Sequence, residues 1–331
     1  MQTLLLARVL KQQKHSVTVV CYFEYDRDVV NEFTTAGIAV DCRGWDRTVG
    51  CMELVRTLTA LFRARTPAIV HVQYMTPGFL PLLAARLANV PRVFATVHQP
   101  ATPYGWKPRL LLRLAAQMCD RFICVSEAAA KSWFGRASRC VVIHNAVDIA
   151  RIDAISPETG RDPKAAPTVI GAVARIRHEK GMDVLLNAFA GITGARLRIV
   201  GDGPDRAALE RRGVANVEWV GQQPWERAIA WMKGMDIVVV PSRFEGFGLT
   251  AAEAMAAGKA VVASDVDGLR EVVGDAGVLV PAGDAAALAV ALKRLLADPQ
   301  ERAVLGRKAR ERVETMFSLE TFCRKIGELY G

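Results

Sequence analysis

Two glutamates in an otherwise apolar stretch are the strongest candidates for chemistry in this chain. Glu245 lies in the turn Pro241-Ser-Arg-Phe-Glu-Gly-Phe-Gly248, and Glu253 follows eight positions later in a helix predicted from small apolar residues. A buried carboxylate without a partner is costly or shifts its pKa, so each glutamate needs a hydrogen-bonding partner. Sugar hydroxyl groups are such partners, and a cap or ion pair within a core helix is the structural alternative.

The segment between the two glutamates also suits an anionic ligand. Gly246 and Gly248 allow backbone N–H groups to approach a ligand closely, and the free N–H groups at a helix start attract anions such as phosphate. The remaining residues of the segment are Phe247, Leu249 and Thr250. We therefore expect this segment to bind a polyhydroxyl ligand that carries phosphate.

The pattern Glu-Gly-Phe-Gly-Leu-Thr-x-x-Glu-Ala-Met-Ala, which begins at Glu245, resembles the signature of the retaining group 1 glycosyltransferases, glycosyltransferase family 4. The resemblance implies an α/β chain with the GT-B fold, in which two Rossmann-like parallel-sheet domains face each other across a cleft. It also implies that Glu253 binds the donor ribose, while Glu245 and the N–H groups of residues 246–249 hold the transferred sugar. It implies no cofactor and no metal ion, because basic side chains and a helix dipole take the place of a cation.

A basic turn upstream is the second candidate segment. In Gly171-Ala-Val-Ala-Arg-Ile-Arg-His-Glu-Lys-Gly181, a predicted strand leads into a turn that holds Arg175 and Lys180. Open α/β sheets bind ligands at the carboxyl ends of their strands. By the resemblance, Arg175 and Lys180 hold the donor diphosphate, the arginine as a bidentate fork and the lysine as a point charge. A solvated basic turn is the alternative, and Arg177 is the weaker candidate.

A glycine turn, Gly201-Asp-Gly203-Pro-Asp-Arg206, follows another predicted strand. It lacks the third glycine of a dinucleotide-binding fingerprint, because Arg206 stands at that position. It resembles the turn that borders the nucleobase pocket in the same glycosyltransferases, although any tight strand-to-helix turn favours the same residues. Further candidates for this pocket, by position alone, are Arg198, Val220 and Gly221.

In the first half of the chain the informative residue is His98, which follows the predicted strand that ends at Val97. A single histidine is more often structural than catalytic. The resemblance implies that this histidine contacts the donor sugar or lines the reaction centre from the acceptor side, and on that ground we assign it a catalytic role. Weaker candidates in the same half are Asp120, Ser126 and Asn145.

The length of 331 residues and a hydrophobic content of 51% suit two domains of ordinary size. The seven cysteines form no C-x-x-C pair, and no apolar run reaches the ~18 residues of a membrane span. These features favour a cytoplasmic protein without structural zinc. Peripheral association with the inner face of the cytoplasmic membrane is compatible with them.

Positive charge is concentrated in the first half of the chain. Residues 1–156 hold 19 Lys and Arg against 11 Asp and Glu, a net charge of +8, out of +9 for the whole chain. This positive charge would attract an anionic membrane surface, or a glycan or lipid-linked acceptor that carries phosphate. The sequence shows no nucleic-acid-binding motif. The segment 71–78 and a helix from Trp106 are acceptor-side candidates. The leucines of that helix, 110, 111, 112 and 114, suit either a bilayer surface or the protein core.

Short apolar strands that alternate with helices predict parallel sheets covered on both faces. Strands are expected at 17–21, 38–41, 68–72, 92–97, 122–125 and 140–143, and again at 168–174, 197–200, 217–220, 237–240, 261–263 and 278–280. We expect domains at 1–150 and 168–315, a polar linker at 151–167, and a last helix at 316–331 that packs back on the first domain.

These observations predict a retaining glycosyltransferase that moves a sugar from a nucleotide-diphosphate sugar to an acceptor hydroxyl, in the synthesis of lipopolysaccharide, exopolysaccharide or another glycan. The alternatives are a truncated or degenerate relative that binds a nucleotide or a partner without turnover, and a nucleotide-sugar epimerase on the same fold. Members of the family open with a strand and a glycine-rich loop, whereas this sequence opens in a pattern resembling their first helix. The resemblance thus leads us to expect a natural enzyme that is longer at its N-terminus, or a poorly active remnant.

Overall fold

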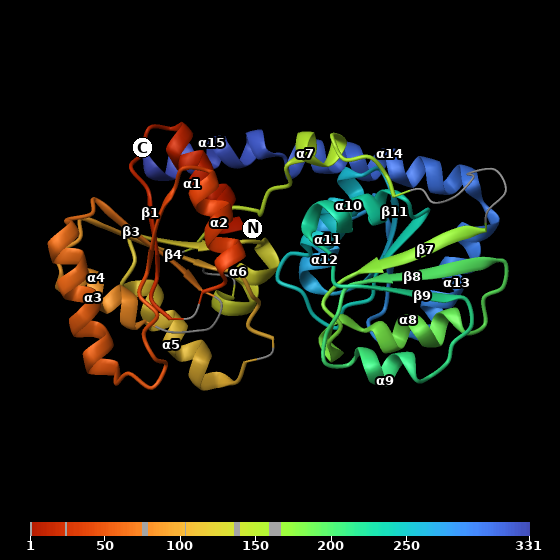
Figure 1. The fold of residues 1–331 in the computed structure, drawn as a ribbon, viewed down its shortest axis with the longest axis horizontal. Coiled ribbons are helices and arrows are strands. Elements are labelled where there is room, and N and C mark those ends of the chain that lie inside the picture. Colours follow the sequence, from red (N-terminus) through yellow and green to blue (C-terminus); the bar gives the residue numbers. More distant parts are fainter. Residues whose placement is uncertain (1, 24, 75–78, 103, 136–139, 159–166) are drawn as a thin grey trace. The chain divides into compact units, whose positions relative to one another are not determined.

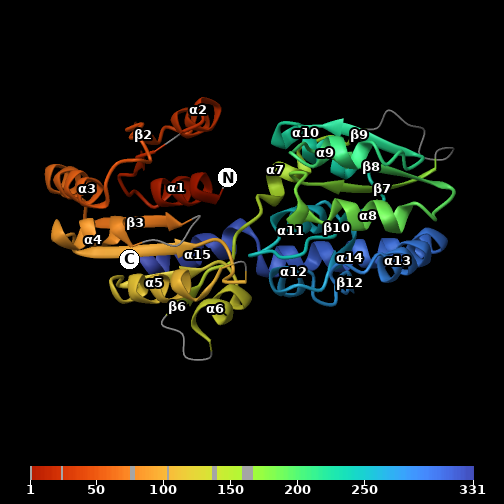
Figure 2. The same cartoon turned by 90° about the horizontal axis from the view of Figure 1, so that it is seen from below.

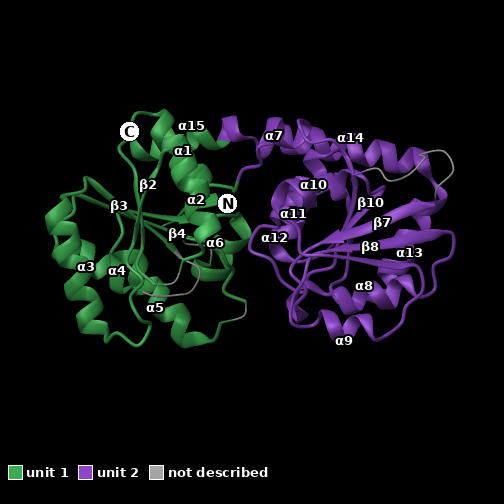
Figure 3. Ribbon diagram, in the orientation of Figure 1, with its two compact units in different colours: residues 1–145, 322–331 green, residues 146–321 purple. Residues whose placement is uncertain are grey.

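The computed structural model describes residues 2–23, 25–74, 79–102, 104–135, 140–158 and 167–331. They form two compact units: unit 1 comprises residues 1–145 and 322–331, and unit 2 comprises residues 146–321 (Figure 3). Each unit has its own parallel sheets and its own hydrophobic core. The predicted α/β architecture of two parallel-sheet domains is therefore confirmed. Much of the predicted linker, residues 159–166, lies outside the described residues.

Unit 2 contains a six-stranded parallel sheet in the order β12-β11-β10-β7-β8-β9 (Figure 1). Its strands are β7 (Thr168–Val173), β8 (Ala195–Val200), β9 (Val217–Gly221), β10 (Ile237–Val240), β11 (Ala260–Ser264) and β12 (Val278–Val280). From β7 the chain proceeds outward through β8 and β9, and then returns to the other side of β7 with β10. This reversal is the topological switch point, where open α/β sheets bind ligands.

Helices cover the sheet of unit 2 on both faces. They are α7 (Ile149–Asp153), α8 (Met182–Phe189), α9 (Arg206–Glu210), α10 (Trp225–Lys233), α11 (Leu249–Ala256), α12 (Asp267–Val273), α13 (Ala285–Ala297) and α14 (Pro299–Met316), with a short 3₁₀ turn at His178–Lys180. The helices α8 and α13 pack together over one face, where Ile170, Leu185 and Leu292 are fully buried. Alternate strand residues face the other way, toward α10, α11 and α14.

The small side chains of α11 allow α14 to pack close to it. Five of its residues are fully buried, namely Ala251, Ala252, Ala254, Met255 and Ala256. In α14, a Cβ on Gly306 would stand 2.2 Å from the carbonyl oxygen of Gly258, just beyond the end of α11. The expected burial of this apolar helix is thus confirmed, and its tight packing gives a rigid support to any residue it carries.

Unit 1 has two separate parallel sheets in its described residues. One pairs β1 (Thr18–Cys21) with β2 (Ala39–Cys42); the other has the order β3 (Ile69–Tyr74), β4 (Arg92–Val97), β5 (Arg121–Cys124) and β6 (Cys140–Val142) (Figure 2). The strands expected at 17–21 and 38–41 are present, but the expectation that the sheets are covered on both faces is wrong for this pair, because no residue of β1 or β2 is fully buried. Each of these two strands has only one strand neighbour among the described residues, so the pair remains half-exposed.

The helices of unit 1 are α1 (Gln2–Gln12), α2 (Arg27–Thr35), α3 (Cys51–Arg65), α4 (Leu80–Leu87), α5 (Trp106–Gln117) and α6 (Glu127–Phe134). The last helix, α15 (Leu319–Tyr330), begins in unit 2 and ends in unit 1. Its residue Tyr330 is buried in unit 1, where the hydroxyl oxygen lies 2.5 Å from Nδ1 of His71 and the carbonyl accepts from Arg92 (2.9 Å). Within the described chain, no helix is both long and apolar enough to cross a membrane.

Candidate functional site

Three loops meet at the carboxyl edge of the unit 2 sheet, and they carry most of the residues singled out in the sequence. The strand β7 leads into the turn with Arg175 and Lys180, β8 leads into the glycine turn 201–203, and β10 leads into the turn with Glu245. Because β7 pairs with both β8 and β10, these loops are direct neighbours. The structure therefore brings three separate sequence segments to the switch point.

The glycine turn after β8 is held against the turn after β7. The N–H group of Ile176 donates to the carbonyl oxygen of Asp202 (2.9 Å). A Cβ on Gly201 would stand 1.9 Å from the carbonyl oxygen of Ala174, and a Cβ on Gly203 would stand 2.2 Å from that of Ile176. The two glycines are thus required by close packing between the loops, and this packing defines one wall of the candidate site.

The turn after β10 is fixed by Arg243. Its backbone N–H donates to the carbonyl oxygen of Glu179 (2.8 Å), and its guanidinium forms two hydrogen bonds with Asp183 (2.8 and 2.7 Å). The same guanidinium lowers the pKa of the Asp183 carboxyl. This bidentate pair occupies the guanidinium of Arg243 within unit 2.

Lys180 and Glu245 form an ion pair across the two loops. The Nζ atom of Lys180 donates to Oε1 of Glu245, and the hydroxyl of Ser242 donates to the same oxygen (3.1 Å). The side chains of Lys180 and Glu245 are 27% and 17% exposed, so both are shielded and still reachable from solvent. The pair therefore presents a cation and an anion side by side at the switch point.

The side chain of Arg175, unlike those of Lys180 and Arg243, has no hydrogen bond or ion pair with any described residue. It is exposed, as is Arg177 two residues further on. A guanidinium without a protein partner can form two parallel hydrogen bonds with phosphate oxygens. Arg175 is thus a cation in the same turn as Lys180 that has no side-chain partner among the described residues.

Gly248 shapes the start of α11. It has φ of +97°, and a Cβ at this position would stand 2.5 Å from Cδ2 of Leu269, so only glycine fits. No side chain of the described structure caps the first turn, which leaves its N–H groups open to a ligand. The side chain of Phe247 instead faces the core, with its ring edge-on to that of Phe317 at 5.3 Å between centroids.

Glu253 lies in the second turn of α11 and accepts a hydrogen bond from the indole N–H of Trp225 (2.8 Å). Burial raises the pKa of Glu253 to about 7, and the indole hydrogen bond opposes part of this shift. On the other side, the guanidinium of Arg151 lies over the Trp225 ring, 4.3 Å from its centroid, and pairs with Glu226. Trp225 was not predicted from the sequence; its place just after the loop that follows β9 was the only available signal.

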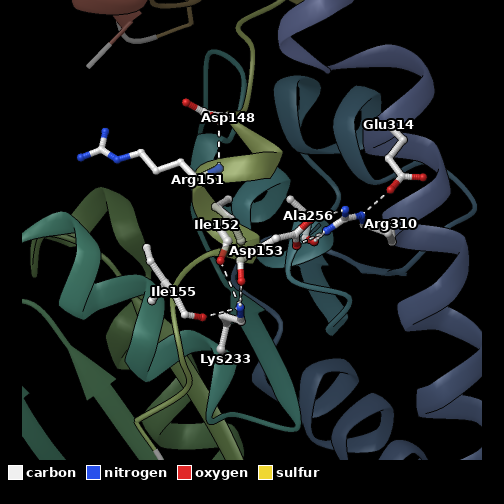
Figure 4. A network of polar contacts seen from close by, with 9 residues as sticks. All are labelled: Asp148, Arg151, Ile152, Asp153, Ile155, Lys233, Ala256, Arg310 and Glu314. Atoms are coloured by element: carbon white, nitrogen blue, oxygen red, sulfur yellow. Dashed lines mark hydrogen bonds and ion pairs between the residues drawn. The ribbon is translucent and has the colours of Figure 1, made fainter. Parts of the chain in front are cut away.

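Lys233 of α10 anchors the segment that carries Arg151 (Figure 4). Its ammonium group donates to the backbone carbonyls of Ile152 (3.0 Å), Asp153 (3.2 Å) and Ile155 (2.5 Å). Three donors of one ammonium thus satisfy the carbonyl groups at the end of α7. The polar composition of residues 151–167 predicts a linker. The described residues of this segment are hydrogen-bonded to unit 2.

Arg310 of α14 completes this network (Figure 4). Its guanidinium forms two hydrogen bonds with Asp153 (2.7 and 2.8 Å) and one with Glu314 (2.6 Å), and it also donates to the carbonyl oxygen of Ala256 (2.6 Å). The guanidinium lowers the pKa of the Asp153 carboxyl. Because Ala256 ends α11, the network connects α7 to the helix that holds Glu253.

Arg198, a pocket candidate from its position, has structural partners in unit 2. The residue is 8% exposed, and its side chain donates to Glu218 (2.9 Å) and lies over the ring of Trp231 at 4.5 Å from the centroid. Both the charge and the flat face of the guanidinium are therefore engaged within the unit.

In unit 1, His98 lines a small cavity of about 30 Å³. Its Nε2 atom lies 2.8 Å from Oε1 of Gln73, and His71 lies 2.7 Å from the hydroxyl of Thr96. The Nε2 atom of Gln73 is buried without a hydrogen-bond partner among the described residues. Burial lowers the pKa of His98 to about 4 and that of His71 to about 3, so both rings are neutral at pH 7. The cavity has room for one or two waters or a single hydroxyl group.

The weaker candidates of unit 1 fall in different places. Asn145 lines the same cavity as His98. Asp120 instead precedes β5, at the amino end of the strand, and accepts from the N–H group of Val93 (2.6 Å). Ser126 caps α6, since its hydroxyl oxygen accepts from the N–H group at position 129 (3.0 Å). Of these three residues, only Asn145 is grouped with His98.

No group of three His, Cys, Asp or Glu side chains in the described ranges is arranged to hold a metal ion. The expectation that donor binding needs no metal stays a prediction.

The doubly wound sheet of unit 2, with a cationic switch point and a carboxylate on the adjoining helix, defines a unit of Rossmann type. Two family descriptions match the chain: "Glycosyltransferase Family 4" over residues 1–151 and "Glycosyl transferases group 1" over residues 167–298. The chain belongs to the group 1 glycosyltransferases, glycosyltransferase family 4.

Relatives of known name agree with this assignment. The phosphatidyl-myo-inositol mannosyltransferase of Mycolicibacterium smegmatis is 34% identical over 258 residues, 74% of this chain and 66% of that protein. The glycogen synthase of Mycobacterium tuberculosis is 28% identical over 292 residues, 81% of this chain and 69% of that protein. The chain thus matches about two thirds of the length of these relatives.

Among solved structures, HepE of Anabaena in complex with UDP and glucose superimposes with a TM-score of 0.83. The sequences are 21% identical, and the match covers 99% of this chain and 95% of that chain. At this level of identity the similarity establishes the fold, which is GT-B, as predicted.

Proposed function

We propose that this protein is a retaining glycosyltransferase that transfers a sugar from a nucleotide-diphosphate sugar to an acceptor hydroxyl. The observation that carries the proposal is the Lys180–Glu245 pair at the switch point of unit 2, with the unpaired Arg175 in the same turn as Lys180. In this arrangement the cations can bind a diphosphate, and the carboxylate can bind sugar hydroxyls, within one site.

The donor binds mainly to unit 2. Arg175 and Lys180 hold the diphosphate, and the open N–H groups at the start of α11 add to the positive field. Glu245 binds the hydroxyls of the transferred sugar. Glu253 binds the ribose hydroxyls, which share or replace its hydrogen bond from Trp225. The glycines 201 and 203 border the nucleobase.

In the transfer step, the oxygen of the acceptor hydroxyl bonds to the anomeric carbon on the face from which the diphosphate departs. The bond between this carbon and the phosphate oxygen breaks, and its electron pair leaves with the nucleoside diphosphate. The hydroxyl proton passes to the departing phosphate oxygen. Because the new bond forms on the face that the diphosphate leaves, the anomeric configuration is retained. Arg175 and Lys180 stabilise the leaving group as its negative charge develops. His98, a neutral imidazole held by Gln73, contacts the donor sugar or the acceptor. No metal ion or cofactor takes part.

The acceptor belongs to unit 1 and is a glycan or a lipid-linked sugar of the kind used in lipopolysaccharide or exopolysaccharide synthesis. Similarity to a mannosyltransferase whose name specifies phosphatidyl-myo-inositol supports a lipid-borne acceptor. A basic first half of the chain supports the same choice, since it attracts phosphate-bearing lipids. The protein would then work in the cytoplasm, at the inner face of the membrane.

A screen of nucleoside diphosphates by thermal unfolding identifies the donor base, because a ligand at ~100 times its dissociation constant adds about 2.7 kcal/mol of stability. Each sugar nucleotide with the stabilising base is then incubated with candidate acceptors. Release of nucleoside diphosphate together with a product of unchanged anomeric configuration supports the proposal. Inversion at the anomeric carbon contradicts a retaining mechanism. Nucleotide binding without turnover identifies a degenerate relative, and a changed sugar without acceptor identifies an epimerase.

A further inference from the structure

The helix α5 of unit 1 turns most of its large apolar side chains toward solvent. The exposed fractions are 70% for Trp106, 50% for Leu110, 39% for Leu111 and 48% for Leu114. Its buried residues are Leu112 and Ala115. The sequence left two interpretations of these leucines open, a core stripe or a bilayer surface, and the structure places three of the four outside the core.

The exposed residues form one continuous ridge. Trp106, Leu110 and Leu114 are spaced by four positions, which places them along one side of a helix with about 3.6 residues per turn. Leu111 widens this ridge, and Leu112 lies on the opposite side, toward the core. Elsewhere in the described chain, exposed large apolar side chains stand no more than one to a helix, as Met52 does on α3 and Val290 on α13. A grouped ridge of this size on one helix marks an interaction surface.

Basic side chains flank the ridge. Lys107, Arg109 and Arg113 are all exposed, and α5 contains no Asp or Glu. The ammonium group of Lys107 lies over the ring of Trp106, 5.7 Å from its centroid. Arg109 and Arg113 each donate one hydrogen bond to a backbone carbonyl of unit 1 (3.3 and 3.0 Å), which fixes their guanidinium groups beside the ridge. The surface therefore combines an apolar centre with a cationic border.

We propose that this face of α5 docks the protein on an anionic lipid bilayer. Trp106, Leu110 and Leu114 enter the boundary between headgroups and acyl chains, and the three basic side chains pair with lipid phosphates. A second copy of the chain fits the surface less well, because a symmetric contact would bring two sets of cations together. Docking on a bilayer does not depend on the proposed function. The purpose of the docking, to bring the enzyme to a lipid-borne acceptor, does rest on it.

Flotation of the full chain with vesicles tests the proposal without turnover. Vesicles of phosphatidylcholine, with and without phosphatidylglycerol, are compared at low and high salt. We expect binding to the anionic vesicles at low salt and a marked loss at high salt, because the Debye length is only ~3 Å at 1 M. The double variant Leu110→Ser/Leu114→Ser lowers the affinity about tenfold or more, since two apolar side chains are lost from the lipid contact. The matched controls Met52→Ser and Val290→Ser bind like the parent.

Trp106 provides a second readout. Its fluorescence should shift to the blue on addition of anionic vesicles, and the variant Trp106→Phe should lack that change. Absence of binding to anionic vesicles at low salt overturns the proposal, and so does equal binding by the parent and the double variant. A dimer seen in ultracentrifugation that the double variant abolishes, without vesicle binding, assigns the face to a second copy instead. Nucleoside diphosphate binding is measured on the same variants. Its absence in every protein, with vesicle binding intact, contradicts the proposed function and leaves the docking surface standing.

Discussion

The indole N–H of Trp225 lies 2.8 Å from a carboxylate oxygen of Glu253, so the first residue of α10 is hydrogen-bonded to the second turn of α11. The ring of Trp225 is in turn covered by the guanidinium of Arg151. A nucleotide whose ribose binds Glu253 therefore meets a carboxylate that is already oriented. Under the proposed function, this relationship would make Trp225 a positioning residue for the donor.

The variant Trp225→Phe should keep the stacked ring and lose the N–H donor. Because that hydrogen bond lowers the pKa of Glu253, its loss raises the pKa further and leaves less carboxylate at pH 7. We expect donor affinity to fall by roughly tenfold at pH 7, in line with ~1.5 to 3 kcal/mol for a hydrogen bond to a charged group, and to recover in part at pH 9. Calorimetric titration at both pH values measures this. A parent-like affinity at pH 7 would show that Trp225 only packs.

Glu253 should also make stability depend on pH. Its pKa is about 7 in the folded protein against an ordinary value of 4.5, so between these values the folded state binds more protons than the unfolded state. The free energy of unfolding therefore falls as pH rises from about 4.5 to about 7 and stays lower above it. Glu253→Gln removes this effect, and we expect it to be more stable than the parent by about 1 to 3 kcal/mol at pH 8. Denaturant unfolding at pH 5 and pH 8 checks the sign, and identical pH profiles would disprove it.

Glu245→Gln and Arg175→Ala should each lower the transfer rate by about a hundredfold or more, because both side chains act on the reacting groups. Neither change is expected to alter the unfolding temperature much, since Arg175 has no side-chain partner among the described residues and Glu245 is partly exposed. The matched control is Arg177→Ala, an exposed arginine of the same turn. Rates at the parent level in both site variants, or an equal loss in the control, would contradict the assignment.

The two buried histidines of unit 1 should weaken the protein in acid. The pKa values of His71 and His98 are lowered by burial to about 3 and about 4, against 6.5 ordinarily, so the unfolded state binds more protons below pH 6.5. The free energy of unfolding then drops as pH falls, by up to about 4 kcal/mol between pH 7 and pH 5. Urea unfolding at these pH values measures the drop, and His98→Gln should reduce it. An unchanged slope in this variant would place the acid sensitivity elsewhere.

The sequence predicted the elements whose signals are local. The continuous apolar run of β4 (Arg92–Val97) gave correct bounds, and the last helix, expected at 316–331, is α15 (Leu319–Tyr330). The helix α2 was missed because it is polar and begins at a local cap, in which Asp26 accepts from two backbone N–H groups. Its apolar face consists of only Val29, Val30 and Phe33, which is a short periodic signal in a polar segment.

For the candidate site, the sequence identified the loops that carry the site residues. It did not identify the distant residues whose hydrogen bonds hold these segments in place. Glycines and charges after predicted strands pointed to the switch point, because the ends of parallel strands meet at one edge. The contact of Arg310 with Asp153 joins residues 157 positions apart, and that of Tyr330 with His71 joins residues 259 positions apart. In each pair, the sequence around one residue contains nothing that indicates its distant partner. The pairing of strands into one sheet or two is likewise set by tertiary contacts, so the separation of β1–β2 from β3–β6 was not predicted.

The separate sheet β1–β2 has a consequence for hydrogen exchange. Two-stranded sheets are marginally stable alone, and this one is supported by a cluster with only four buried residues, Leu4, Ala7, Phe33 and Ile38. We expect it to open as a local cooperative block, so that amides of β2 exchange with deuterium at least ~100 times faster than those of β4. Mass spectrometry of peptides from the two strands measures the ratio, and equal protection would contradict the idea.

The helix α1 belongs to both regions, because Leu4 and Ala7 lie in this block while Gln2 and Leu6 line the cavity at His98. Opening of the block would then also displace Gln2 and Leu6 from the lining of the cavity. The size and polarity of the space beside His98 would thus be coupled to a local unfolding equilibrium.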